Sequence, residues 1–262
     1  MGQASNAVDY KLADGLRYRY EVENCVKEMA GQDVKGKLKT AGVDKIVSIK
    51  VKEKENKNKI AVLYAEGEIR DEDSSSPFSA DEQVISEEMA NKLRKLKDDD
   101  DVKAVVFRVN SPGGSAYISE QIWKEVVELK AKKPIVVSMG NYAASGGYYI
   151  SCAANKIVAE RTTLTGSIGV FGVVRNFTGT FDKVGVTTDI VKTNTFADLG
   201  DISRPMREDE KALIQRGVEQ TYDLFLTRCA DGRGMTKAEI DSIGQGRVWT
   251  GEQALDCLLY TS

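Results

Sequence analysis

The segment Gly140-Asn-Tyr-Ala-Ala-Ser145-Gly-Gly-Tyr-Tyr149 follows an apolar strand, opens a helix, and sets a serine in the turn between them. The small alanines and glycines that flank Ser145 would let a substrate carbonyl come close to its hydroxyl. The N–H of Gly146, at the start of the predicted helix, could donate to a developing oxyanion. The pattern therefore indicates Ser145 as a candidate nucleophile.

The chain of 262 residues contains no histidine. A serine hydroxyl is a weak nucleophile until a base removes its proton, and a Ser-His-Asp triad is impossible here. A base for Ser145 would have to be a lysine, whose pKa burial can lower from about 10.4 toward the operating pH.

Composition excludes several other function classes. Hydrophobic residues make up 41% of the chain and charged residues 29%, and the net charge is −3, which gives no reason to expect nucleic-acid binding. The four cysteines are scattered without a CxxC pair, so neither a zinc site nor another cofactor is predicted. No apolar window reaches the roughly 18 to 20 residues of a membrane span.

Along most of the chain, short continuous apolar runs alternate with longer segments in which apolar residues recur at the spacing of a helix face. This alternation predicts an α/β fold in which helices cover a parallel sheet. The predicted strands lie at 60–64, 102–109, 134–138, 156–159, 168–174 and 187–192, and the predicted helices at 81–97, about 118–129, 208–230 and from 236 onward. A small lobe is predicted at 8–47 with a helix over 22–29, followed by a charged linker at 50–59. A loop at 74–80 could border the site.

A second glycine turn, Asn110-Ser-Pro-Gly-Gly114, ends the strand before the one that leads to Ser145. Pro112 fixes φ, and glycines remove side chains that would keep a ligand away from backbone N–H groups. The turn could simply join a strand to a helix. Its position one strand-helix unit before Ser145 favours a role for Gly113 or Gly114 as the second oxyanion donor.

Three motifs together resemble the signal peptide peptidase A family of serine-lysine peptidases, also called protease IV. They are Asn110-Ser-Pro-Gly-Gly114, Ala143-Ala-Ser-Gly-Gly-Tyr148 and Leu164-Thr-Gly-Ser-Ile-Gly169. The resemblance implies a ClpP/crotonase-like superhelix of ββα units. It also implies that Ser145 is the nucleophile and that Gly146 with Gly113 and Gly114 forms the oxyanion hole. Ser167 would hydrogen-bond the amine of the base lysine.

The base lysine itself is not found at the place that the family predicts. Short members carry it just after the strand that here reads Thr188-Asp-Ile-Val-Lys192, where this chain has Phe196 or Ala197, and Lys192 lies a few residues early. Long members are tandem repeats with the lysine in the first and the serine in the second. The chain resembles such a second repeat, with residues 1–58 as the end of a preceding repeat plus linker and 59–262 as the serine-bearing repeat, truncated at its C-terminus.

The resemblance implies a serine endopeptidase that degrades remnant signal peptides and other membrane-proximal peptides. It also implies a homo-oligomeric ring and membrane association of the full-length protein, with the catalytic part outside the bilayer. Two other interpretations remain open. One is a scaffold repeat without catalysis, which the missing lysine favours; the other is crotonase-type acyl-CoA chemistry, which usually needs carboxylates at the glycine turns.

Overall fold

The computed structural model describes residues 8–9, 11, 14–42, 57–71 and 83–257. The chain divides into two compact units, Met1–Glu55 and Asn56–Ser262. The predicted loop at 74–80 and residues 50–56 of the predicted linker at 50–59 lie outside the described residues. None of the described helices is both long enough and apolar enough to cross a bilayer.

The first unit contains one helix in its described part, α2 (Arg19–Met29), which begins three residues before the predicted helix. Lys27 is buried at its C-terminal end and donates from Nζ to the carbonyl of Val34 at 3.3 Å. This contact folds the glycine-containing segment after α2 back against the helix.

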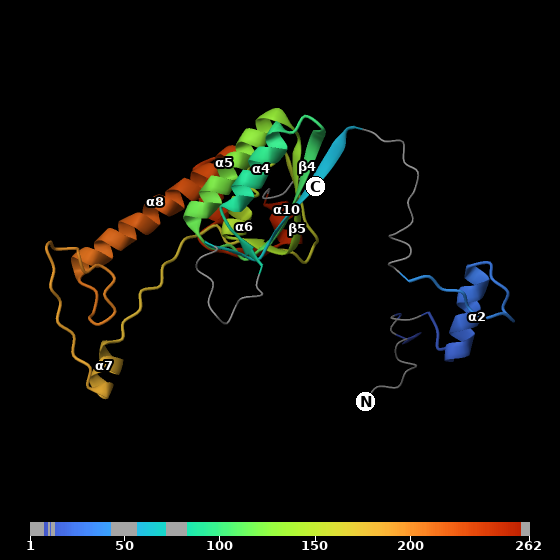
Figure 1. The fold of residues 1–262 in the computed structure, drawn as a ribbon, viewed down its shortest axis with the longest axis horizontal. Helices are drawn as coiled ribbons and strands as arrows, with labels where there is room; N and C mark the ends of the chain where they lie inside the picture. The colour runs from blue at the N-terminus through green and yellow to red at the C-terminus, as the bar shows by residue number, and fades with distance from the viewer. Residues whose placement is uncertain (1–7, 10, 12–13, 43–56, 72–82, 258–262) are drawn as a thin grey trace. The chain divides into compact units, whose positions relative to one another are not determined.

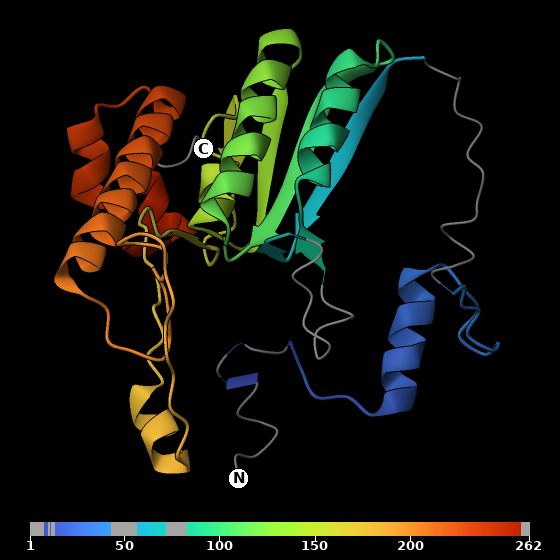
Figure 2. The same cartoon turned by 60° about the vertical axis from the view of Figure 1, so that its left-hand side comes forward.

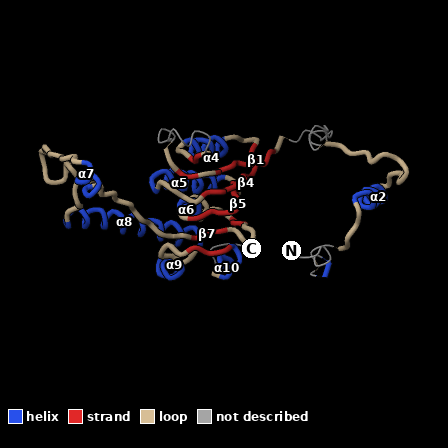
Figure 3. Tube along the Cα trace, turned by 90° about the horizontal axis from the view of Figure 1, so that it is seen from below, coloured by secondary structure: helices blue, strands red, loops and turns tan. Residues whose placement is uncertain are grey.

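The second unit is built around a mainly parallel sheet with the strand order β1-β4-β5-β7-β8, and β6 pairs with β5 (Figures 1 and 3). All of its neighbouring strands are parallel except β7 and β8, which run antiparallel. The strands are β1 (Lys59–Glu66), β4 (Val102–Ser111), β5 (Ile135–Ala144), β6 (Lys156–Val158), β7 (Leu164–Gly166) and β8 (Val248–Thr250). A short parallel pair, β2 (Glu68–Ile69) with β3 (Val84–Ile85), lies beside it.

Helices α4 (Glu88–Asp98), α5 (Ala116–Lys132) and α6 (Gly146–Tyr149) lie along one face of the sheet (Figures 2 and 3). The other helices of this unit are α7 (Thr178–Val184), which lies away from the sheet, α8 (Glu208–Arg233), α9 (Lys237–Ile243) and α10 (Gly251–Asp256). Ser115 caps α5 by accepting a hydrogen bond from the Ile118 N–H, and Thr236 and Thr250 cap α9 and α10 in the same way.

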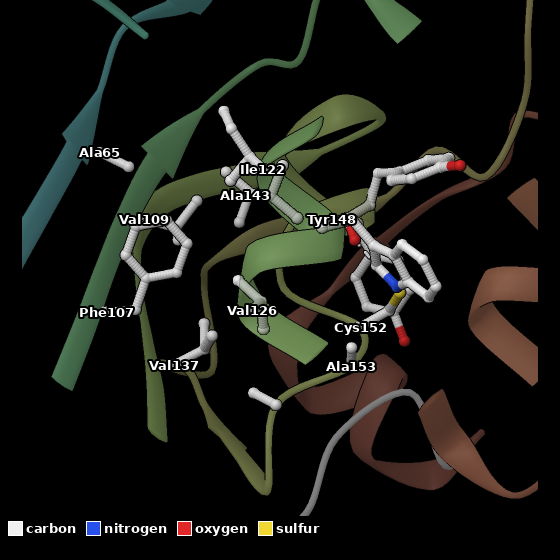
Figure 4. Close-up of a cluster of buried hydrophobic side chains, with 14 of the residues drawn as sticks. Ala65, Phe107, Val109, Ile122, Val126, Val137, Ala143, Tyr148, Cys152 and Ala153 are labelled. Atoms are coloured by element: carbon white, nitrogen blue, oxygen red, sulfur yellow. Dashed lines mark hydrogen bonds between the residues drawn. The ribbon is translucent and has the colours of Figure 1, made fainter. Parts of the chain in front are cut away.

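The core fills the space between the sheet and these helices (Figure 4). Alternate residues of β4 and β5, among them Phe107, Val109 and Val137, are fully buried, and they face apolar residues of α5 such as Ile122 and Val126. Cys152 is fully buried there. The alternation of strands and helices thus gives the predicted α/β architecture.

The opposite face of the sheet exposes apolar side chains. Ile60, Val62 and Tyr64 of β1 are 53% to 69% exposed, and Val158, Leu164 and Val248 continue the apolar surface across β6, β7 and β8. Parallel sheets are usually covered on both faces. This second unit therefore leaves a substantial apolar surface open to a partner.

Two predicted strands are wrong. Residues 168–174 and 187–192 are not strands. All but residues 168–169 belong to an irregular arm, residues 170–207, which carries α7 and leads into α8 (Figures 1 and 2). Apolar residues such as Val173 and Val191 are 77% and 97% exposed there. Their short runs of apolar, β-branched residues resemble strands, but no described strand lies beside them to complete a ladder. The predicted helix at 81–97 begins later, at Glu88, because Val84 and Ile85 form β3.

Candidate active site

The two glycine turns meet at the carboxyl ends of neighbouring strands. β4 ends at Ser111 and β5 at Ala144, and the two strands pair in parallel, with Ser111 opposite Ala143. The turn after β4 therefore lies against the turn that holds Ser145. A Cβ built on Gly113 would lie 2.6 Å from the Gly146 nitrogen and 2.8 Å from the Ser145 Cβ. Only glycine allows the two turns to approach this closely.

Ser145 has a strained backbone conformation, with φ at 52° and ψ at −121°. Non-glycine residues rarely adopt such angles, and they persist only where the surrounding structure holds them. The Ser145 N–H donates to the Gly166 carbonyl at 3.0 Å, and its carbonyl accepts from the Tyr149 N–H at 2.9 Å. These bonds hold the serine in a sharp turn from β5 into α6, half-buried at the cavity wall.

All five predicted site residues line one cavity. Its volume is about 400 Å³, and Gly113, Gly114, Ser145, Gly146 and Ser167 contribute to its wall. We call it the glycine-side cavity. The rest of its wall includes Ala116 and Ser119 of α5, Tyr149, and Thr221 and Phe225 of α8, together with Glu68, Pro112 and the segment 169–171.

The N–H groups at the two turns differ in whether they already donate a hydrogen bond within the protein. The Gly113 N–H donates to Ser111 Oγ at 3.2 Å. Among the hydrogen bonds of the described residues, neither the Gly114 N–H nor the Gly146 N–H has an intramolecular partner. Gly114 and Gly146 are therefore better oxyanion-donor candidates than Gly113. Gly113 has a spatial role, since it makes room for the Ser145 turn.

Ser167 lies beside Ser145 at the start of the segment after β7. Its φ is 47°, and its N–H donates to the Arg247 carbonyl at 2.8 Å. Gly166, one residue earlier, accepts the bond from Ser145, so β7 couples the two serines. Ser145 and Ser167 both line the glycine-side cavity.

A second cavity of about 560 Å³ adjoins the first. Ser145, Ser167 and Phe171 line both, and α8 supplies Gln215, Val218, Glu219 and Tyr222 to the second. We call it the helix-side cavity. The two cavities form one cleft on either side of Ser145, and α8 is a wall of both.

Sequence reasoning missed α8 as part of the site. Val218, Tyr222 and Phe225 recur at the spacing of one helix face. That periodicity was a usable signal, but it predicts burial just as well. Only the folded chain brings this face to a serine more than seventy residues earlier in the sequence.

A hydrogen-bonded network fixes the wall behind the nucleophile. Tyr149 donates from its hydroxyl to Glu120 of α5 at 2.6 Å, and Arg228 of α8 donates to the same carboxylate. The Arg228 guanidinium lies 3.9 Å from the centroid of the Trp123 ring. Burial, reinforced by the Glu120 carboxylate, holds the pKa of Tyr149 well above its usual range. Tyr149 therefore stays protonated and keeps α5, α6 and α8 together.

Lys192 does not lie at the candidate site. Its Nζ pairs with Asp198 at 3.0 Å, within the arm, and neither residue lines the cleft. No lysine lines either cavity in the part of the chain that the structure describes. That same part contains no cluster of histidine, cysteine, aspartate or glutamate suited to a metal ion.

A strand-end serine beside two glycine turns defines the class of site found in serine peptidases. The comparisons with known proteins agree. The Peptidase family S49 model matches residues 127–260, and the Clp protease model matches residues 74–168. The chain belongs to peptidase family S49, and its domain is Clp protease-like, as the motifs predict.

Three curated relatives show how much of such proteins the chain covers. It is 39% identical to Protease 4 of Salmonella typhi over 96% of its own length and 40% of the relative's. It is 35% identical to "Serine protease SPPA, chloroplastic" of Arabidopsis thaliana, covering 93% of this chain and 36% of that one. It is 37% identical to "Putative signal peptide peptidase SppA" of Enterococcus faecium, covering 82% of this chain and 62% of that one. The chain spans less than two thirds of each relative.

Proposed function

We propose that this chain carries the nucleophile half of a serine endopeptidase site. Ser145 attacks the peptide carbonyl, and the N–H groups of Gly146 and Gly114 receive the oxyanion. The supporting observation is the strained Ser145 turn, which meets the Pro-Gly-Gly turn at a peptide-sized cleft. Such a conformation has a free-energy cost of about 1–3 kcal/mol.

The general base is a lysine from outside this chain, delivered by a preceding repeat or by another subunit. It takes the Ser145 proton as the new C–O bond forms and returns it to the leaving amine. Ser167 hydrogen-bonds the lysine amine and orients it. Two facts support this division: the described cleft contains no lysine, and Lys192 is neutralised by Asp198 at a separate place.

The substrates are peptides; the name of one relative, a putative signal peptide peptidase, favours signal peptides, and we extend the proposal to other membrane-proximal peptides. On this proposal, residues 59–262 form the serine-bearing repeat and residues 1–58 the end of a preceding repeat with its linker. The full-length protein is a homo-oligomer associated with a membrane. The exposed apolar face of the sheet, from Ile60 to Val248, supports assembly because such a surface favours a partner over water.

The test is cleavage of a fluorogenic apolar peptide by the chain alone and by the chain mixed with a lysine-bearing repeat. Activity is expected only in the mixture, and Ser145→Ala should abolish it. Lys192→Ala should leave the activity of the mixture unchanged. Activity of the chain alone that Lys192→Ala removes would instead place the base in the arm.

A catalytically silent scaffold repeat is the second candidate, favoured by the same lack of a lysine in the cleft. Folded protein that cleaves nothing in either arrangement would support it.

A further inference from the structure

The charged side chains that line the cleft beside Ser145 all have the same sign. In the part of the chain that the structure describes, two charged side chains line it: Glu68 in the glycine-side cavity and Glu219 in the helix-side cavity. Both are carboxylates, one on each side of the candidate nucleophile.

The two carboxylates differ in whether a cationic side chain lies beside them. Glu68 has Arg70 beside it, with Nε 3.8 Å from Oε2. Glu219 accepts a neutral hydrogen bond from Gln215 Nε2 at 3.0 Å, and none of the ion pairs in the described part of the chain includes it. Glu219 is thus a carboxylate on the α8 wall of the cleft with no cation paired to it in the described part of the chain.

The neighbours of Glu219 suit the stem of a long cationic side chain. Val218, Tyr222 and Phe171 line the same cavity and are apolar over most of their surface. The Tyr222 hydroxyl donates to Asp241 at 2.6 Å and accepts from the Gln245 N–H, so it is already engaged. A lysine or arginine side chain could lie along these residues and bring its charge to Glu219.

We propose that Glu219 is a specificity-determining residue that selects peptides with a basic residue close to the scissile bond. The inference deepens the proposed function and depends on the cleft binding peptides. Glu68 adds a weaker preference of the same sign. Acidic peptides are disfavoured, because the described lining offers them no cation.

The test measures peptide binding, so that it does not depend on the external base. Fluorescein-labelled alanine-leucine decapeptides carry a single Lys, Gln or Glu at one position on either side of the central bond. Their affinity for the Ser145→Ala protein is followed by fluorescence anisotropy. The best Lys peptide should bind about two- to fivefold more tightly than its Gln counterpart, as for an exposed ion pair, and the Glu peptide more weakly. Salt should reduce the difference.

Two variants separate a local contact from net charge. Glu219→Gln should remove the preference for Lys, and Glu219→Lys should reverse it in favour of the Glu peptide. Glu208→Gln is the matched control, because it removes the same charge from the same helix but away from the cleft, where Glu208 pairs with Lys211. The control should keep the preference.

The outcomes distinguish the two proposals. Peptides that bind without regard to charge, or a Lys preference that survives Glu219→Gln, would overturn the role of Glu219 and leave the peptidase cleft intact. No binding of any peptide would overturn both.

Discussion

Gly113 offers the sharpest test of the site's geometry. In Gly113→Ala, the new Cβ would lie 2.6 Å from the Gly146 nitrogen, 2.8 Å from the Ser145 Cβ and 2.9 Å from the Ala144 carbonyl oxygen. All three are backbone or Cβ atoms, so no flexible side-chain end can move aside. The φ of 104° at Gly113 is also a conformation that alanine strongly resists.

The expected magnitude combines these two effects. Backbone strain costs about 1–3 kcal/mol, and overpacking costs about 1–3 kcal/mol more. The free energy of unfolding should therefore fall by about 2–6 kcal/mol. To reach the 3.4 Å of ordinary van der Waals contact, the two turns must also separate by roughly 0.8 Å. A displacement of about 1 Å at a nucleophile can cost about 100-fold in rate.

Urea unfolding followed by tryptophan fluorescence measures the first effect, and peptide cleavage in the active mixture measures the second. Gly217→Ala is the control. Gly217 lies within α8 with open space around its Cβ position, so alanine should raise stability by about 0.5–1 kcal/mol. A Gly113→Ala protein as stable and as active as the parent would refute the close contact between the two turns.

Three further predictions concern the surroundings of the site. The hydrogen bond from Arg204 lowers the pKa of Glu210, whereas burial raises it; the effect of Arg204 is larger, and the pKa falls to about 2. Because that pKa is lowered on folding, the attachment of the arm to α8 should be complete above about pH 5 and lost as pH falls toward 2, which protease sensitivity of the arm can follow. Burial raises the pKa of Cys229, so iodoacetamide at pH 8 should label Cys25 well before Cys229, and equal rates would contradict that burial. Thr250→Ala removes the cap of α10 and should cost about 0.5–2 kcal/mol in urea unfolding, whereas Thr250→Ser should restore most of it.

The nucleophile turn could be predicted from sequence because its chemistry is local. Ser145, Gly146 and the Pro-Gly-Gly turn each follow a strongly apolar strand, and parallel strands bring their carboxyl ends to one edge. The α8 wall could not be predicted in the same way. Its place depends on a contact at Gly232, where a Cβ would lie only 2.4 Å from the Cys152 carbonyl oxygen. No local pattern links two positions eighty residues apart.

The arm shows the opposite failure, in which a local pattern was present and misleading. Residues 168–174 and 187–192 contain apolar, β-branched residues as strands do, but a strand is stable only with a neighbour to complete its ladder. In the described part of the chain, the end of the arm is held instead by ion pairs of Arg204 with Asp198 at 2.8 Å and with Glu210 at 2.6 Å. A short apolar run alone cannot distinguish a strand from an exposed segment that presents the same residues to solvent.

The rigid wall behind Ser145 and the exposed arm both fit the proposal that the base comes from outside this chain. A base that arrives from another repeat or subunit can work only if the nucleophile side is rigid, because docking then sets the distance between the two groups. The Tyr149–Glu120–Arg228 network supplies that rigidity by joining α5, α6 and α8 directly behind Ser145. The N-terminal half of α8 and the arm lie beyond this network, and they expose apolar side chains such as Phe171 and Val191. On the proposed function, one rigid wall beside one exposed arm suits a nucleophile whose base is supplied by another repeat or subunit.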